Sequence, residues 1–267
     1  MDIREIRRRF DAAARDYERH DALEREVGER LLQRLEYARR PVQRALDLGC
    51  GTGRAGAALK TRFADAAVIS LDISQGMLAG LKVRSHREER WFAVMGELDR
   101  LPFAARCADL IFCNLALQWA DDFARALGEF RRVLRPDGML LFTVPGPDSL
   151  RELRGQLGRG ASAEIPIYMP DLRDVGDLLV STGFSEPVMD SEMIKLSYPD
   201  AAAMAQELAV TGGAGFARLP APAGGGGGVE VNFEIVYGTA FGAPEGRPVR
   251  SGQGEVATFS VDQLRRK

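Results

Sequence analysis

The sequence predicts an α/β fold in which helices flank a doubly wound, mostly parallel, seven-stranded sheet. Short apolar runs alternate with helical segments through most of the 267-residue chain, which is typical of parallel sheets. Two of these runs end in an acid, Asp47 and Asp72, and Gly49, Gly51 and Gly53 follow the first. Open parallel sheets bind ligands at the carboxyl ends of their strands. The pattern therefore predicts a nucleoside-type ligand at that edge.

Two amphipathic helices are expected before the sheet. The range 2–19 places apolar residues at helical spacing, and so does the range 21–38. These apolar positions are Ile3, Ile6, Phe10, Ala13 and Tyr17 in the first helix, and Leu23, Val27, Leu31 and Leu35 in the second. Pro41 ends the second helix. Neither helix is needed to complete the sheet, so residues 1–40 are expected to form a helical lid over the ligand site.

The ligand-binding core is expected over residues 41–146. Its strands are predicted at 43–48, 67–72, 91–95, 108–113 and 139–144. Its helices are predicted at 53–62, from about Ser74, and at 121–134. Ser74 is a suitable N-cap, and Pro136 and Gly138 are expected to separate the last helix from the fifth strand.

The remaining segments, 147–267, are expected to belong to the same single domain. Helices are predicted at 148–157, 171–183 and 200–210, and strands at 188–198, 231–237 and, more weakly, 255–261. The range 212–228 contains five consecutive glycines, which cannot support regular structure. A flexible loop is therefore expected there.

The glycine loop limits the classes of ligand that the site could bind. A dinucleotide fingerprint requires a third spaced glycine where Arg54 stands, and no Gly-Lys-Ser/Thr follows that would make a phosphate loop. The remaining pattern, acid-x-Gly-x-Gly-x-Gly, resembles the first motif of the class I methyltransferases, which have a Rossmann-like fold and bind S-adenosylmethionine (SAM). Glycine would let the backbone approach the amino-acid end of SAM without a Cβ clash. A tight turn without a ligand is the alternative.

This resemblance implies a set of contacts with SAM. Asp47 would lie near the ammonium group, Asp72 would accept hydrogen bonds from the ribose hydroxyls, and Glu97 with Leu98 would contact the adenine. The implied cofactor-binding residues are Asp47, Gly49, Gly51, Gly53, Asp72, Ile73, Glu97, Leu98 and Asn114. For Glu97, a solvated loop acid is the alternative interpretation.

Three further segments resemble a narrower family, the malonyl-acyl-carrier-protein O-methyltransferases of biotin synthesis. They are Arg9-Phe10-Asp11-Ala12-Ala13-Ala14 with Tyr17, then Asn114-Leu115-Ala116-Leu117-Gln118-Trp119, and Phe142-Thr143 with Gly146, Ser149-Leu150 and Glu152-Leu153. The resemblance covers roughly residues 3–210 and resumes near 231. It implies SAM-dependent methylation of the free carboxylate of malonyl-carrier protein or malonyl-CoA.

The same resemblance implies three catalytic-site residues. Tyr17 would lie in the lid near the methyl-transfer site, and Gln118 and Trp119 would wall the acceptor pocket. The alternatives are an ordinary aromatic on an amphipathic helix for Tyr17, and loop packing for Trp119. A carboxylate is already deprotonated at pH 7, so the reaction needs no general base, and a chain with only two histidines suits it. Orientation alone can supply about 7–11 kcal/mol of such a barrier.

Composition excludes several other classes. A net charge of −2 is not that of a globally basic nucleic-acid binder. The cysteines, Cys50, Cys107 and Cys113, have no metal or redox spacing, and no apolar run reaches membrane-spanning length. We therefore expect a cytoplasmic monomer without a metal, a nucleic-acid partner or a membrane association. The arginines at 7–9 are interleaved with acids, which favours a solvated helix face over a surface that docks an acidic carrier protein.

One segment departs from the family pattern. Members usually carry a longer segment at 211–230, with a helix that caps the acceptor site, whereas this chain has a short glycine-rich stretch. Two alternative functions therefore stay open. One is a SAM-binding assembly or interaction factor related to respiratory-complex assembly proteins, and the other is a methyltransferase for another small carboxylate.

Overall fold

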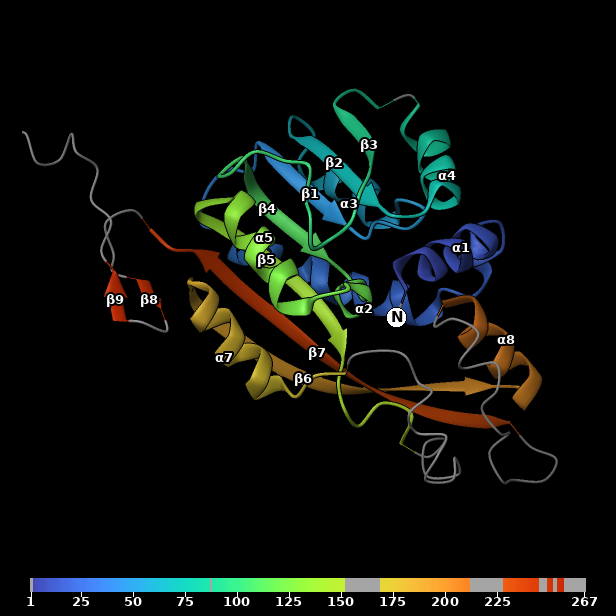
Figure 1. Ribbon diagram of the computed structural model, residues 1–267. Coiled ribbons are helices and arrows are strands. Elements are labelled where there is room, and N and C mark those ends of the chain that lie inside the picture. The colour runs from blue at the N-terminus through green and yellow to red at the C-terminus, as the bar shows by residue number, and fades with distance from the viewer. Residues whose placement is uncertain are drawn as a thin grey trace, which may run out of the picture.

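The computed structural model describes residues 2–86, 88–151, 169–211, 228–244, 249–251 and 254–256. A seven-stranded sheet with the order β3-β2-β1-β4-β5-β7-β6 forms its centre (Figure 1). The strands are β1 Arg44–Leu48, β2 Ala67–Asp72, β3 Trp91–Met95, β4 Ala108–Cys113, β5 Leu134–Pro145, β6 Phe184–Tyr198 and β7 Val229–Gly242. Within this sheet β7 runs antiparallel to both of its neighbours, and the other pairings are parallel. The predicted mostly parallel, seven-stranded sheet is confirmed.

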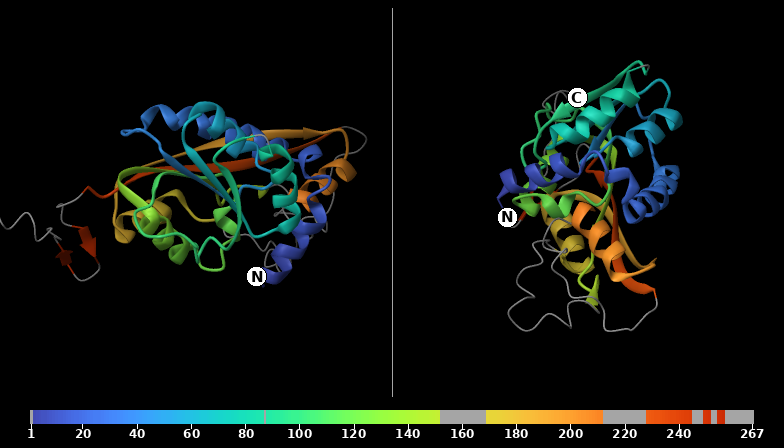
Figure 2. Two further views of the ribbon diagram at one scale, coloured as in Figure 1. Left: turned by 90° about the horizontal axis from the view of Figure 1, so that it is seen from above. Right: turned by 90° about the vertical axis from the view of Figure 1, so that its right-hand side faces the viewer.

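Helices cover both faces of this sheet (Figure 2). The α-helices are α1 Ile3–Ala13, α2 Ala22–Gln33, α3 Arg54–Arg62, α4 Gln75–Ser85, α5 Phe123–Val133, α7 Leu172–Thr182 and α8 Ala201–Thr211. Three short 3-10 helices lie at Tyr17–Arg19, Arg34–Tyr37 and Leu117–Trp119, and a separate hairpin consists of β8 Val249–Ser251 and β9 Gly254–Val256. No helix within the described ranges is long and apolar enough to cross a membrane.

Two hydrophobic cores hold the layers together, one on each face of the sheet. Successive residues of a strand point to opposite faces, so Ala45 belongs to one core and Leu46 to the other. The first core packs β1 and its neighbours against α2, α3 and α4, and the second packs them against α5 and α7. This double covering explains why every residue of β4 is buried.

Most predicted elements are confirmed, but several boundaries were wrong. Each expected N-terminal helix ends early and continues as a 3-10 turn. β5 begins at Leu134, so the expected separator at 136–138 lies inside the strand as an irregularity in which Asp137 has φ 56°. β6 and β7 are longer than predicted because they pair with each other over nearly their whole length. The predicted helix at 148–157, the loop at 212–228 and the strand at 255–261 lie largely outside the described residues.

The two N-terminal helices have different roles in packing. α2 buries Val27 and Leu31 completely and is part of the first core. α1 buries only Ile6 and lies against α4 and α8 beside the carboxyl ends of the parallel strands (Figure 1). Asp11 of α1 accepts hydrogen bonds from Ser74 Oγ at 2.7 Å and from the Gly76 amide at 2.9 Å. These bonds attach α1 to the start of α4.

Further contacts connect the N-terminal segment to the glycine loop. Arg54, at the position that excluded a dinucleotide fingerprint, donates to Asp21 Oδ2 at 2.8 Å. Glu18 pairs with Arg84 near the end of α4. Arg54 therefore connects α3 to the start of α2, a role that depends on its charge and reach.

Substitution of Gly238 tests how tightly β5 packs against β7. It faces Phe142 across the antiparallel pair, and a Cβ there would lie 2.1 Å from Phe142 Cε1 in a fully buried site. Gly238→Ala is expected to lower the free energy of unfolding by about 1–3 kcal/mol because the ring must move. Gly128→Ala in α5, where a Cβ meets nothing within 4 Å, should raise it by about 0.5–1 kcal/mol. Urea denaturation measures both, and equal effects would contradict this account.

Candidate functional site

Three adjoining cavities lie at the carboxyl ends of the parallel strands. The central cavity is bounded by the loops after β1, β2, β3 and β4 and by α1. The glycine-loop cavity lies between the 49–53 loop and α2, and shares Tyr17, Gly49, Gly51 and Asn114 with the central cavity. The Gln118 cavity lies among α2, α8 and the β6–β7 pair, and shares Leu115, Trp119 and Thr211 with the central cavity. The sequence predicted a site at this edge, and the structure divides it into three parts.

The glycine loop has the backbone conformation that its residues predict. Gly49, Gly51 and Gly53 have φ angles of 69°, 53° and 89°, a region that favours glycine. A Cβ on Gly49 would lie 2.1 Å from the Ala116 Cβ, and one on Gly53 would lie 2.9 Å from Leu81 Cγ. The glycines at 49 and 53 are therefore needed for packing as well as for the turn.

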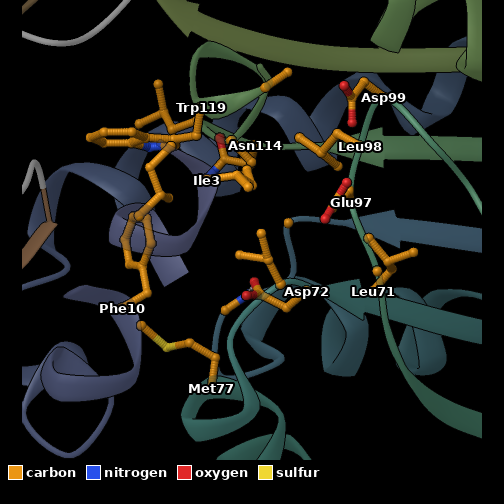
Figure 3. A pocket seen from close by; sticks show the side chains of 18 of the residues that line it. Ile3, Phe10, Leu71, Asp72, Met77, Glu97, Leu98, Asp99, Asn114 and Trp119 are labelled. Atoms are coloured by element: carbon orange, nitrogen blue, oxygen red, sulfur yellow. Dashed lines mark hydrogen bonds between the residues drawn. The ribbon is translucent and has the colours of Figure 1, made fainter. Parts of the chain in front are cut away.

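Asp72 organises the edge of the central cavity. Its Oδ2 accepts a hydrogen bond from the Gly51 amide at 2.9 Å, and its Oδ1 accepts one from the Ser74 amide at 2.8 Å. Burial raises the pKa of Asp72 to about 6 although these amides favour the charged form. Figure 3 shows Asp72, Glu97 and Leu98 on one side of the cavity, with Phe10 and Trp119 on the other. Ile73, predicted with Asp72, also lines this cavity.

Asp47 is the more deeply buried of the two strand-end acids. It is 2% exposed, lines the glycine-loop cavity, and accepts a hydrogen bond from Ser70 Oγ at 3.3 Å. Burial, with the nearby charge of Asp72, raises the pKa of Asp47 to about 7. A cationic ligand group in this cavity would favour the ionised form of Asp47.

The side chain of Asn114 is already used in the fold. Its Nδ2 donates to the Glu24 carbonyl at 2.8 Å, and its Oδ1 accepts from Thr143 Oγ1 at 2.9 Å. Asn114 lines two of the cavities but ties α2 to β4 and β5 through this side chain. The next residue, Leu115, has φ 45°, a strained conformation for a branched side chain, and its amide donates to Thr143 Oγ1.

Tyr17 lies where the central and glycine-loop cavities meet. It begins the 3-10 turn after α1 rather than continuing the helix, and a Cβ on Gly51 would lie 3.8 Å from its ring. Burial, with the charges of Glu24 and Asp72, raises the pKa of the Tyr17 phenol well above its usual range. Tyr17 is therefore a neutral hydroxyl at physiological pH.

Gln118 and Trp119 lie together on the 3-10 helix after β4. The Trp119 ring meets the Phe10 ring edge-on, with centroids 5.5 Å apart, and lines both the central and the Gln118 cavity. Gln118 is 8% exposed and lines the Gln118 cavity alone. Its Nε2 donates to the Leu115 carbonyl at 2.8 Å, which leaves Oε1 buried without a partner among the described residues.

Sequence reasoning missed several groups that line these cavities. Asp99 is buried in the central cavity, two residues after Glu97, and its place in the same loop was the available signal. Glu24, Tyr198 and Glu207 line the Gln118 cavity, and Tyr198 donates to Glu207 Oε1 at 2.9 Å. These three residues come from α2, β6 and α8, and no sequence motif connects them. Within the described ranges no cluster of three His, Cys, Asp or Glu residues could hold a metal ion.

Solved structures share this fold. The YcgJ protein from Bacillus subtilis aligns with a TM-score of 0.59 at 18% identity, over 82% of this chain and all of that one. A phosphoethanolamine N-methyltransferase 2 from Haemonchus contortus, solved with S-adenosyl-L-methionine, aligns with a TM-score of 0.60 at 18% identity, over 88% of this chain and 57% of that one. Residues 46–142 match the family model described as a methyltransferase domain.

Curated relatives are considerably more similar. The malonyl-[acyl-carrier protein] O-methyltransferase of Methylovorus sp. (strain MP688) is 41% identical over 79% of this chain and 74% of that protein. The protein of the same name from Halorhodospira halophila is 35% identical over 100% of this chain and 97% of that protein. Identity at this level extends beyond the glycine loop to both the N-terminal and the C-terminal segments. The chain belongs to the malonyl-[acyl-carrier protein] O-methyltransferase family.

Proposed function

We propose that this protein transfers the methyl group of SAM to the free carboxylate of malonyl-carrier protein or malonyl-CoA. The product would be the methyl ester that starts pimeloyl synthesis for biotin. The adjoining central and Gln118 cavities carry this proposal, because a donor and an acceptor held in them would meet beside Leu115 and Trp119. The family relatives act on the same class of acceptor by name, which supports the carrier-borne malonyl group.

The residues that line the central and glycine-loop cavities suit SAM as the methyl donor. Asp72 keeps lone pairs for two ribose hydroxyls beyond its two amide contacts, and Asp47 can face an ammonium group. Ile73, Met77 and Leu98 supply apolar surface for an adenine, with Glu97 at its edge. We assign Asn114 a positioning role, since its side chain is committed to Glu24 and Thr143.

The reaction is a direct displacement. SAM, held by the glycine loop, Asp47 and Asp72, would supply a methyl group on a sulfonium sulfur. The carboxylate oxygen would bond to that methyl carbon, the electron pair of the broken carbon–sulfur bond would stay on sulfur to give S-adenosylhomocysteine, and no proton would move. The protein must therefore align the carboxylate and exclude water, since no base is required. The paired rings of Phe10 and Trp119 line one side of the central cavity, and the neutral Tyr17 hydroxyl can orient a reactant by donating a hydrogen bond.

The alternatives receive less support. The relatives are O-methyltransferases by name, which does not favour an assembly factor without catalytic activity. Methyl transfer to another small carboxylate can be distinguished by testing a panel of carboxylates as acceptors.

Incubation with SAM is expected to add one methyl ester to malonyl-carrier protein, because the acceptor carboxylate is already ionised. Intact-mass spectrometry of the carrier protein measures the change. Acetyl-carrier protein, which lacks the free carboxylate, is the control and should stay unmodified. Absence of the ester from malonyl-carrier protein and malonyl-CoA, with SAM binding intact, would exclude this acceptor.

Asp72→Ala is expected to weaken SAM binding about ten- to a hundred-fold, because hydrogen bonds to a charged acceptor contribute roughly 1.5–3 kcal/mol. Isothermal titration calorimetry measures the affinity. Asp65→Ala, at an exposed position before β2, is the matched control and should bind normally. Unchanged affinity in the Asp72 variant would refute its assignment to the ribose.

Tyr17→Phe is expected to lower kcat about ten-fold or more while the affinity for S-adenosylhomocysteine (SAH) stays near normal. The variant keeps the packing of the ring and loses only the hydroxyl. Because the protein holds this hydrogen-bond donor in place before the reaction, its loss slows turnover. Steady-state kinetics and calorimetry separate the two effects. Full turnover by this variant would remove the hydroxyl from the mechanism.

A further inference from the structure

Glu24 places an unpartnered carboxyl oxygen next to the proposed acceptor site. It lies in the first turn of α2 and lines both the Gln118 cavity and the glycine-loop cavity. Its Oε2 is buried and has no hydrogen-bond partner among the described residues. A buried polar atom without a partner is costly unless a ligand or water completes it. Gln118 Oε1, on the wall of the same Gln118 cavity, is buried in the same state.

The groups around Glu24 disfavour its charged form. Asp21 precedes it at the start of α2, and Glu207 faces it from α8. The phenols of Tyr17 and Tyr198 also interact electrostatically with Glu24. A hydrogen bond from the Thr211 hydroxyl favours the charged form of Glu24 but does not outweigh these influences. No lysine or arginine appears among the described residues that line the Gln118 cavity, whereas Arg25 and Arg54 line the glycine-loop cavity, which Glu24 also borders.

Burial is the largest influence on Glu24 and raises its pKa to about 8, with the charges of Asp21 and Glu207 adding to the effect. The group therefore carries a proton at neutral pH and loses it as the pH rises above about 8. A protonated carboxyl has one O–H donor, whereas an ionised one only accepts. An ionised Glu24 would repel an incoming carboxylate.

We propose that Glu24 is a specificity residue that binds the acceptor carboxylate by donating a hydrogen bond from its own protonated carboxyl group. This inference rests on the proposed function, because it takes the acceptor to be a carboxylate in the Gln118 cavity. The donor would hold one acceptor oxygen and leave the other free to receive the methyl group. A hydrogen bond from a neutral acid to a carboxylate is charge-assisted, which makes it strong without a fixed positive charge.

A competing role for Glu24 follows from its second cavity. An ionised Glu24 would pair with the ammonium group of SAM beside Asp47, since both acids line the glycine-loop cavity. The two roles differ in the protonation state of Glu24 and in the ligand that would lose affinity. A neutral isostere distinguishes them, because glutamine donates hydrogen bonds but carries no charge.

The experiment compares the wild-type protein with Glu24→Gln, Glu24→Ala and the control Glu36→Gln, which changes an exposed acid. The kcat/KM for malonyl-carrier protein is measured from pH 6.5 to 9.5 at saturating SAM, and SAH affinity is measured by calorimetry. For the wild type and the Glu36 control, kcat/KM should fall roughly ten-fold per pH unit above about pH 8. Glu24→Gln should stay active across that range with unchanged SAH affinity. Glu24→Ala should raise KM about ten- to a hundred-fold.

Each remaining outcome counts against a specific statement. Identical pH profiles for the wild type and Glu24→Gln would overturn the proposal, and so would a ten-fold or greater loss of SAH affinity in Glu24→Gln. The second result would assign an ionised Glu24 to the methyl donor. A wild type that methylates no malonyl acceptor would overturn the proposed function itself, so the two failures are distinguishable. Circular dichroism of each variant identifies a loss of folding, and Glu24→Gln then decides because it preserves shape.

Discussion

The carboxylate of Asp72 is the contact on which the arrangement of the site depends. It accepts hydrogen bonds from the Gly51 amide and the Ser74 amide, and so joins the glycine loop to the start of α4. Ser74 in turn donates to Asp11, which brings α1 to the same point. Parallel pairing of β1 with β2 sets Asp47 opposite Ser70, so Asp72 lies two residues further toward the carboxyl ends of the strands. Three stretches distant in sequence, at α1, at the end of β1 with the glycine loop, and at the end of β2 with the start of α4, thus meet around one acid.

Burying acids at this edge has an electrostatic consequence. Burial raises the pKa values of Asp47, Asp72 and Glu24, so each acid holds its proton to a higher pH than it would in water. A charged ligand group in these cavities would therefore change the protonation of the acids beside it. In the proposed function, the ammonium group of SAM would favour an ionised Asp47, and an anionic acceptor would favour a neutral Glu24. The same burial therefore serves opposite purposes in adjoining cavities.

Local features of the sequence predicted much of the fold and the donor side of the site. The turn at 49–53 needs positive φ angles, which Gly49, Gly51 and Gly53 adopt without a Cβ clash, and apolar runs ending in Asp47 and Asp72 predict strand ends. Boundaries were less predictable, because pairing with β7 extends β6 and an irregularity continues β5 through Pro136. Hydrogen bonds between strands override the local turn preference there. The preferences of individual residues such as Pro136 do not predict this pairing with distant strands.

The sequence by itself determined which functional groups follow the strands at the carboxyl edge of the sheet. In chain order they are an acid, a glycine turn, a second acid and a polar segment ending in Trp119. It also determined the family, since the resemblance stated from its motifs agrees with the relatives. Only the tertiary structure decided that Asn114 holds α2 in place, and that Glu24 meets Gln118, Tyr198 and Glu207 around one cavity. The physical reason is that periodicity and turn preference are local, whereas a cavity is formed by side chains that packing brings together from distant elements.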